Sequence, residues 1–326
     1  MDIGMMMPAG FEPDEKMKLA EKADSLGVEL LLVGEANDTN VFVDLTNFAL
    51  HTSDVKIGAG IANVFSRSPS LIAQSTAELD RISDGRLVLG LGASTKPLVE
   101  QHHGLRFEKP VQRISEYIDI IKSGWGGEAI QYDGQFFSPS GGRIKTPPIQ
   151  DDPPIAIAAL GRRNRQLTGA KADMWFPHLV PGRVIDDLAT DIYTEAAEHG
   201  RSTADIRIAA YVPTAVAEER ADAREQLRGH IASYVGAAES YQRIIARGGY
   251  EEQAREIYQA WQSGNRSAAR ERVSTELIDD VGIATTSAGI TERIDEWVSA
   301  EVDILVVHFP PRTSVEQAMT TLDSIY

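Results

Sequence analysis

The chain has 326 residues and a mass of 35.6 kDa, which suits either two ordinary domains or one large α/β barrel. It contains no cysteine, so disulfides, thiolate zinc sites, iron–sulfur clusters and a cysteine nucleophile are excluded. Its 32 basic and 48 acidic residues give a formal net charge of −16, which disfavours nucleic acid and anionic membranes as partners.

Strands and helices alternate along the first hundred residues. Apolar runs predict strands over residues 2–7, 29–33, 56–62 and 86–92. The first helix begins at Pro13, has acidic residues in its first turn, and is ended by Gly27. Further helices are predicted over residues 42–51 and 68–83. The alternation is typical of a parallel sheet covered by helices.

The same rhythm continues through the rest of the chain. After a helix near residues 111–121, a small hairpin is predicted over 131–137, around Asp133-Gly134. Four more strands are predicted over residues 153–159, 172–176, 206–212 and 303–308. Eight strands separated by helices favour an α/β fold of the closed (β/α)8 TIM-barrel type over an open doubly wound sheet.

The chain is longer than a plain barrel of this type needs. It exceeds a typical barrel of about 250 residues by roughly 75. Most of the excess lies at about residues 216–282, a stretch rich in Ala, Glu, Gln and Arg, which predicts a helical insertion after the seventh strand. No linker divides the chain, so we expect one domain over residues 1–326. Met5, Met6 and Met7 alternate sides of the first strand, and at least one should line the barrel interior.

Three motifs follow one another at the barrel's predicted third and fourth units. Arg67-Ser68-Pro69 opens a helix, Ser83-Asp84-Gly85-Arg86 ends it, and Leu89-Gly90-Leu91-Gly92 forms the next strand. In this order they resemble the luciferase-like flavin and deazaflavin oxidoreductases. The resemblance covers nearly the whole chain and is thin only in the helical insertion. Residues 57–67 are most similar to the coenzyme F420-dependent methylenetetrahydromethanopterin reductases of that family.

The resemblance implies a function and a cofactor. It implies hydride transfer between coenzyme F420 and a small organic substrate, with the methylene group of a tetrahydromethanopterin- or folate-type one-carbon carrier as a candidate. FMN is the alternative cofactor. The resemblance also implies a non-prolyl cis peptide bond between Gly60 and Ile61, beneath the central ring of the cofactor. The residues expected to contact the cofactor are Gly60, Ile61, Asn63, Gly92, Ala93, Ser94, Ala159, Leu160, Gly161 and Arg162.

Several of these residues have a second interpretation. Glu35 follows the second strand, where it serves either as a catalytic group near the cofactor or as a salt-bridge partner of a neighbour. Asn63 either contacts the cofactor or caps the next helix. Gly161 and Arg162 open a helix whose free N–H groups suit a cofactor phosphate, or they form a plain basic first turn.

The histidines differ in what their positions predict. His178 and His308 each follow a predicted strand, so both point toward the site, either to bind substrate or to pack there. His102 and His103 are adjacent, and because adjacent side chains diverge on a helix or strand, we expect no metal site.

The chain also departs from the reductases that it resembles. Those enzymes carry an Asp-His pair after the second strand and acids after the first and fourth strands. This chain has Glu35-Ala36 at the first of these places, and Met5-Met6-Met7 and Ala93-Ser94-Thr95 at the others. If the family's acids act on the pterin, this chain must handle its substrate differently. Two alternatives therefore stay open, an FMN-dependent monooxygenase and a non-catalytic flavin-binding barrel.

Other properties are expected from composition or from the resemblance. No basic n-region opens the chain, and no stretch approaches the roughly 18 apolar residues of a membrane span, so we expect a cytoplasmic protein. Dispersed acids with few lysines are typical of proteins from salt-accumulating halophiles, and equally of ordinary acidic enzymes. The resemblance implies a homodimer or higher homo-oligomer that acts on a small molecule.

Overall fold

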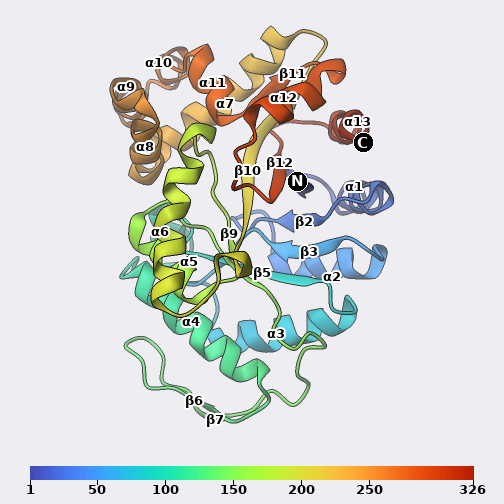
Figure 1. The fold of residues 1–326 in the computed structure, drawn as a ribbon, viewed down its shortest axis with the longest axis vertical. Helices are drawn as coiled ribbons and strands as arrows, with labels where there is room; N and C mark the ends of the chain where they lie inside the picture. The colour runs from blue at the N-terminus through green and yellow to red at the C-terminus, as the bar shows by residue number, and fades with distance from the viewer.

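Eight parallel strands close into a barrel in the computed structural model, which describes residues 1–326 (Figure 1). Each strand pairs with the next, and the last strand pairs with the first, so the predicted (β/α)8 fold is confirmed. In order round the barrel the strands are β1 (Asp2–Met6), β2 (Leu30–Val33), β3 (Lys56–Ala59), β5 (Leu87–Gly92), β8 (Ile155–Ile157), β9 (Met174–Trp175), β10 (Arg207–Val216) and β12 (Ile304–His308).

Helices cover the outside of the barrel and contact one another around it. The helices around the barrel are α1 (Pro13–Leu26), α2 (Val41–His51), α3 (Pro69–Ile82), α4 (Pro110–Trp125), α5 (Arg162–Lys171), α6 (Ile185–Glu198), α12 (Ile290–Trp297) and α13 (Val315–Ile325). Short turns of helix occur at η1 (Leu98–His102), η2 (Gly182–Val184), η3 (Thr203–Asp205), η4 (Ala246–Tyr250) and η5 (Ser287–Gly289). No helix combines the length and the apolar composition needed to cross a membrane.

Local sequence signals define the helix ends as expected. Gly27 ends α1 in the left-handed region, at a φ of 78°, where glycine carries no steric penalty. The Ser68 side chain caps α3 by accepting a hydrogen bond from the backbone N–H of Leu71 at 3.2 Å.

Two strands differ in extent from the prediction. The third strand was expected over residues 56–62, but β3 ends at Ala59, and a short β4 (Ala62–Asn63) resumes the pairing with β5. The expected cis peptide bond, Gly60–Ile61, lies between them. The seventh strand runs four residues beyond the predicted end at Val212, because Thr214–Val216 pairs with β11 (Ile283–Thr285), a ninth parallel strand outside the barrel.

Five helices occupy the stretch where the insertion was expected. They are α7 (Arg220–Ala237), α8 (Glu239–Ile245), α9 (Glu251–Gln262), α10 (Arg266–Glu271) and α11 (Thr275–Val281). Figure 1 shows them gathered at one end of the long axis of the molecule, with the hairpin of β6 (Ile130–Gln131) and β7 (Ser140–Gly142) at the other end. The insertion therefore adds to one side of the barrel instead of forming part of its helical ring.

The hairpin is longer than predicted. Its returning strand was expected to end by residue 137, but β7 begins at Ser140. The buried carboxylate of Glu116 accepts hydrogen bonds from the backbone N–H groups of Gln135, Phe136 and Phe137, at 2.9, 2.9 and 3.2 Å. These N–H groups are therefore unavailable for strand pairing, so the returning strand β7 begins only at Ser140.

Apolar side chains form two layers, one inside the barrel and one between the barrel and its helices. Met6 belongs to the inner layer with Leu32, Phe176 and Tyr211, while Met5 and Met7 belong to the outer one. The expectation that a methionine of the first strand lines the barrel is thus confirmed for Met6.

The motif Ser83-Asp84-Gly85-Arg86 holds the barrel together at the N-terminal ends of its strands. The Arg86 guanidinium donates to the backbone carbonyls of Ser83 at 2.7 Å, Val55 at 2.8 Å, Thr52 at 2.9 Å and Ala49 at 3.1 Å. One side chain thus satisfies carbonyl groups from the ends of two helices and from the start of β3. A guanidinium can do this because its five N–H donors are fixed in one plane.

Replacing Arg86 with lysine is expected to lower the free energy of unfolding by about 2–4 kcal/mol, because a single ammonium group leaves partly buried carbonyls without donors. Urea unfolding followed by circular dichroism measures the loss. Arg81 is exposed on the neighbouring α3, and R81K is the matched control, expected to change the stability by less than about 0.5 kcal/mol. Equal stability of the two variants would contradict this account of the motif.

Candidate active site

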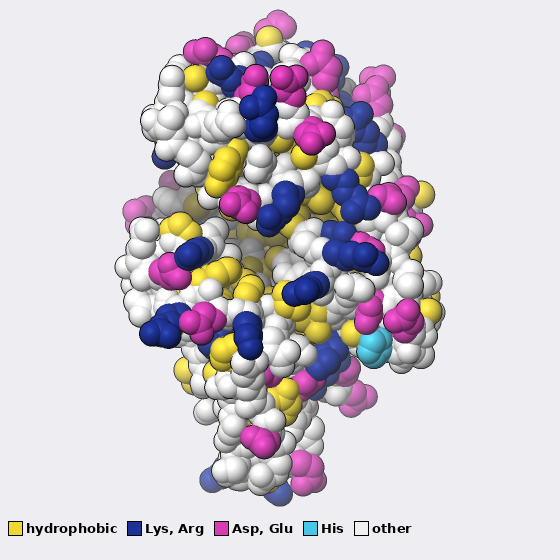
Figure 2. All heavy atoms as spheres, turned by 90° about the vertical axis from the view of Figure 1, so that its left-hand side faces the viewer, with side chains coloured by type: hydrophobic (Ala, Val, Ile, Leu, Met, Phe, Trp, Pro, Cys, Tyr) yellow, Lys and Arg dark blue, Asp and Glu magenta, His cyan; other side chains and the backbone are white.

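A cavity of about 300 Å³ opens at the C-terminal ends of the barrel strands. Figure 2 shows a hollow with a largely hydrophobic floor and with Lys and Arg side chains around its rim. The lining includes six residues predicted from the sequence: Glu35, Gly60, Ile61, Ser94, His178 and His308. The structure therefore brings together site residues predicted at the ends of several strands, as the barrel topology requires.

Two glycines allow close packing at the floor of this cavity. A Cβ atom on Gly60 would stand 2.7 Å from both the Met6 Cε and the Tyr211 Oη. A Cβ atom on Gly92 would stand 2.6 Å from the Ile61 Cγ1. Because real Cβ atoms do not approach other atoms so closely, any larger residue at either position would force Met6, Tyr211 or Ile61 to shift. The two glycines thus leave room for the side chains of Met6, Tyr211 and Ile61, which line the cavity.

Glu35 lies at the edge of the cavity in an ion pair. Its carboxylate accepts from both terminal nitrogens of Arg67, at 2.6 and 2.8 Å, and from the backbone N–H of Asn63 at 3.1 Å. The side chain is 6% exposed. Of the two interpretations of Glu35, the salt bridge is present, and it ties the end of β2 to the segment after β3. The catalytic role of Glu35 stays a prediction, and the pairing favours a positioning residue because both carboxylate oxygens are engaged by Arg67.

Asn63 is fully buried beside the cavity and does not line it. Its Oδ1 accepts from the backbone N–H of Phe65 at 2.9 Å, whereas its Nδ2 is buried without a partner. The interpretation of Asn63 as the cap of the next helix is wrong, because Ser68 caps α3. Among the residues expected after the fourth strand, Ser94 lines the cavity, while Gly92 supports Ile61 from below and Ala93 lies outside the lining.

The predicted residues after the fifth strand lie farther from the cavity. Ala158 lines it, whereas Ala159 is fully buried, with its carbonyl accepting from the Trp175 Nε1 at 2.7 Å. Successive side chains of an extended segment point in opposite directions, so the residue next to one that faces the cavity faces the core. Gly161 is the N-cap residue of α5.

Two arginines in the first turn of α5 form ion pairs with Asp191. Arg162 lies there with its side chain 73% exposed and pairs with Asp191 at 3.3 Å. The Leu160 carbonyl accepts a hydrogen bond from Arg165, which also pairs with Asp191. The expected contacts of Leu160, Gly161 and Arg162 with a cofactor stay predictions.

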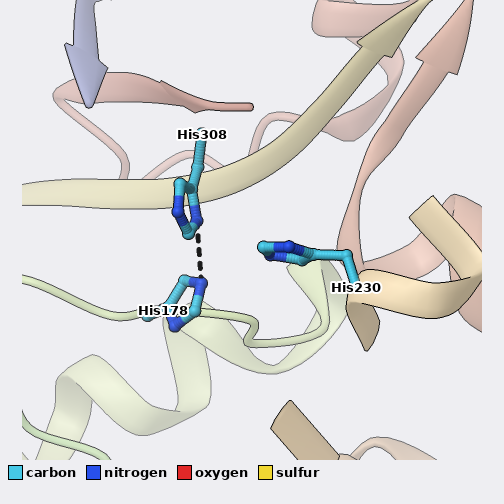
Figure 3. A group of neighbouring side chains, drawn as sticks. All are labelled: His178, His230 and His308. Carbon is cyan, nitrogen blue, oxygen red and sulfur yellow. Dashed lines mark hydrogen bonds between the residues drawn. The ribbon is translucent and has the colours of Figure 1, made fainter. Parts of the chain in front are cut away.

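Three histidines meet at one wall of the cavity (Figure 3). His178 follows β9 and His308 ends β12, and the Nε2 of the first lies 3.0 Å from the Nδ1 of the second. His178 Nδ1 is also 2.9 Å from the Tyr241 Oη. The third, His230, points from α7 toward the other two, and neither of its ring nitrogens has a hydrogen-bond partner.

Burial determines the protonation of this wall. Loss of contact with water lowers the pKa of His308 to about 4. Burial, followed by the proximity of the other histidines, lowers the pKa of His178 and of His230 well below the ordinary value. All three imidazoles are therefore neutral at pH 7. Burial also raises the pKa of Tyr211, so its phenol keeps its proton.

Sequence reasoning missed four aromatic and imidazole side chains of this wall. Tyr211 lies within the predicted seventh strand near its C-terminal end, a position that could have marked it. His230 and Tyr234 are four residues apart on α7, and this spacing places them on one helix face. Tyr241 follows on α8 without a comparable signal. His230, Tyr234 and Tyr241 belong to the insertion, so only the packing of the insertion brings them to this wall, whereas Tyr211 lies inside the barrel on β10.

Comparison with known proteins decides the family. Residues 1–303 match the family model described as luciferase-like monooxygenase. The chain belongs to the luciferase-like family. A 5,10-methylenetetrahydromethanopterin reductase of Archaeoglobus fulgidus is 31% identical over 305 residues, which cover 92% of this chain and 90% of the relative. This confirms the resemblance seen in the motifs between residues 57 and 92.

Solved structures agree with this luciferase-like fold. A coenzyme F420-dependent tetrahydromethanopterin reductase from Methanopyrus kandleri superposes with a TM-score of 0.86 at 24% identity, over 99% of this chain and 98% of the other. The oxygenating constituent of 3,6-diketocamphane monooxygenase from Pseudomonas putida, solved in complex with FMN, gives a TM-score of 0.72 at 16% identity over 100% of this chain and 96% of the other. At these identities the likeness concerns the fold alone.

The buried histidines make the stability of this luciferase-like barrel depend on pH. Below pH 6.5 an unfolded histidine takes up a proton that buried His308 refuses until about pH 4. Each such histidine therefore lowers the free energy of unfolding by about 1.4 kcal/mol per pH unit as the pH falls below 6.5. For His308 the loss should extend from pH 6.5 to about pH 4, and above pH 6.5 the effect should vanish.

Urea unfolding at pH 7.5, 6.5 and 5.5 in metal-free buffer tests this expectation. Buried carboxylates titrate in the opposite sense, since burial raises the pKa of Asp173 and of Asp280, so the comparison is made between variants. H308N should reduce the slope of the free energy of unfolding against pH by about 1.4 kcal/mol per pH unit below pH 6.5. H51A, which removes an exposed imidazole, should leave the slope unchanged. Parallel declines in wild type and H308N would contradict the assignment.

Proposed function

We propose that this protein is a coenzyme F420-dependent oxidoreductase that transfers a hydride to or from a small organic substrate. The observation that carries the proposal is the apolar cavity floor around Gly60, where the absence of a side chain lets Met6 and Tyr211 pack closely, in a chain of the luciferase-like family. The relative from Archaeoglobus fulgidus supports the same class, because it is a reductase that shares 31% of its residues with this chain along nearly its full length.

The residues of the cavity suit such a cofactor. Gly60, Ser94 and Ala158 present backbone or small side chains beside the apolar side chain of Ile61, which leaves room for a flat ring system. Basic side chains stand around the hollow although the whole chain carries a net charge of −16, which favours an anionic ligand (Figure 2). Arg162 is exposed beside the N-terminus of α5, where backbone N–H groups are free to hold a phosphate.

In this proposal the protein positions the reactants and excludes water. The bound deazaflavin supplies two-electron hydride chemistry. Gly60 and Ile61 would hold one face of the ring, and a substrate would be bound from the side of His178 and His308. Neutral imidazoles and protonated phenols on that wall can donate or accept hydrogen bonds without adding charge. Glu35 and Arg67 hold the segment after β3 in place beneath the reactants.

A one-carbon carrier of the tetrahydromethanopterin or folate type is the candidate substrate. Its support comes from the reductases among the similar proteins. Met5, Met6, Met7 and the Ala93-Ser94-Thr95 run lack the carboxylates that the family carries at these places, so the chain would hold the pterin through the tyrosine and histidine wall instead. A small molecule is proposed as the partner, and the homodimer stays a prediction.

An FMN-dependent monooxygenase is the second candidate. It is favoured by the description of the matched family and by the similar fold of a monooxygenase solved in complex with FMN. The same floor can support either ring system, because the two tricycles have nearly the same shape. The choice therefore has to be made by measuring which cofactor binds and what it does.

Cofactor titration followed by absorbance and fluorescence tests the proposal. We expect coenzyme F420 to bind at least about 10-fold more tightly than FMN, since a tenfold ratio needs only about 1.4 kcal/mol of selective contacts. We also expect its visible absorbance to change on addition of a substrate from a panel of methylene-pterins, methylene-folates, alcohols and ketones. Tight binding of FMN without F420 would favour the monooxygenase, and binding of F420 without turnover of any substrate would favour a non-catalytic barrel.

The substitution Ala158→Phe is expected to abolish F420 binding, because the phenyl ring would occupy the cavity while the core stays intact. Binding should be absent at concentrations that saturate the wild type. Ala197→Phe on the exposed end of α6 adds the same ring outside the cavity and should bind normally. Normal binding by A158F would show that the ring lies elsewhere.

Arg162→Ala is expected to weaken F420 binding about 3- to 10-fold, the effect of losing one exposed charge-assisted contact to a phosphate. The phosphate-free deazaflavin nucleoside should bind equally well to both proteins. Arg255→Ala, which removes an exposed arginine of α9, serves as the control for net charge. Equal losses for the cofactor and the nucleoside would show that Arg162 does not contact the phosphate.

A further inference from the structure

We propose that His178, His230 and His308 bind a single late transition-metal ion, of the Zn²⁺ class, at the wall of the cavity. The sequence predicts no metal site, because these residues lie far apart along the chain and its only adjacent pair, His102 and His103, diverges. Folding joins them from three elements: the segment after β9, helix α7 and the end of β12.

The geometry fits three imidazole ligands around one ion. One nitrogen from each ring lies within 4.8 Å of the others, and the His178 Nε2 and His308 Nδ1 are 3.0 Å apart. Nitrogens bound to zinc at about 2.0–2.1 Å in a tetrahedral arrangement are separated by roughly 3.3 Å. Small side-chain rotations therefore suffice. Figure 3 shows the His230 ring directed toward the hydrogen bond between the other two rings, where an ion would lie.

The state of His230 points to a ligand. The residue is 3% exposed, and neither ring nitrogen has a hydrogen-bond partner. Buried polar groups almost always have a partner, so this imidazole lacks what a buried side chain of its type normally finds. Coordination of an ion would use its lone pair. The substitution of a leucine or phenylalanine would fill the same space without the penalty, so packing alone does not account for a histidine there.

The surroundings hold the ligands in a suitable orientation. The Tyr241 hydroxyl oxygen can accept from the Nδ1–H of His178, at 2.9 Å, which leaves the His178 Nε2 lone pair pointing toward the other histidines. The ring of Tyr234 lies edge-on to His178, with centroids 4.5 Å apart, and 4.9 Å from His230. Both tyrosines enclose the cluster, as the outer residues of a metal site do.

The ligand set defines the class of ion. Three neutral imidazoles, with neither thiolate nor carboxylate, suit Zn²⁺, Cu²⁺, Ni²⁺ and Fe²⁺ and not Mg²⁺ or Ca²⁺, which require oxygen ligands. His178 and His308 both line the cavity, so a fourth coordination position would face it and accept a small exogenous ligand.

Metal binding by the whole, untagged chain tests this site, after removal of metal with a chelator and without any F420, so the result is independent of the proposed function. Zn²⁺ titration should give one ion per chain, and Co²⁺ should give the visible absorption of a tetrahedral site. H230A should lose at least about 100-fold in affinity, and Y241F about 10- to 100-fold. H51A, which removes an exposed histidine, should bind like the wild type.

The Tm in the presence of Zn²⁺ and the response of the Co²⁺ spectrum to azide give two further tests of the site. Zn²⁺ should raise the Tm of the wild type and of H51A but not that of H230A, whose circular dichroism spectrum should remain that of the folded barrel. Azide should change the Co²⁺ spectrum by occupying the open position. Wild-type protein that binds less than one ion per chain, or H230A that binds as well as the wild type, would overturn the site. A Co²⁺ spectrum unmoved by azide would overturn the open position.

Discussion

The parallel pairing of β1 with β12 is the contact on which the candidate active site depends. It sets Met6 opposite His308 and joins the first strand of the barrel to the last. Because β12 also pairs with β10, with Pro213 opposite His308, the last strand is held between the first strand and the strand that leads into the insertion. The C-terminal ends of the strands then all lie at one end of the barrel, where the loops and the insertion supply side chains to the cavity.

Steric constraint at the floor determines what the cavity can hold. Gly60 and Gly92 are surrounded by Met6, Tyr211 and Ile61 at distances that leave no room for a Cβ atom. The floor is therefore apolar and closely packed, and the polar and titratable side chains of the cavity stand on its walls. One wall carries Glu35, which Arg67 holds by an ion pair. The opposite wall carries buried tyrosines and histidines that stay uncharged at neutral pH.

The motifs that indicate the family serve the scaffold more than the chemistry. Arg86 satisfies carbonyl groups at the N-terminal ends of the strands, on the side away from the cavity. Arg67 binds Glu35, and its backbone carbonyl accepts from the Tyr117 hydroxyl. Such residues recur in a fold because many elements depend on them at once. The residues that would distinguish substrates come instead from α7 and α8, where the motifs give no information.

The sequence by itself determined the order of strands and helices and the barrel, because each follows from residue patterns local to one segment. The motifs between residues 57 and 92 indicated the family, and that resemblance implied the cis peptide bond between Gly60 and Ile61. The tertiary structure alone decided which side chains meet. It paired Glu35 with Arg67 and brought His308 to His178, 130 positions away. It turned Ala158 instead of Ala159 to the cavity. These outcomes depend on which side chains of a strand face the cavity and on packing between distant segments. No local periodicity in this chain indicates either.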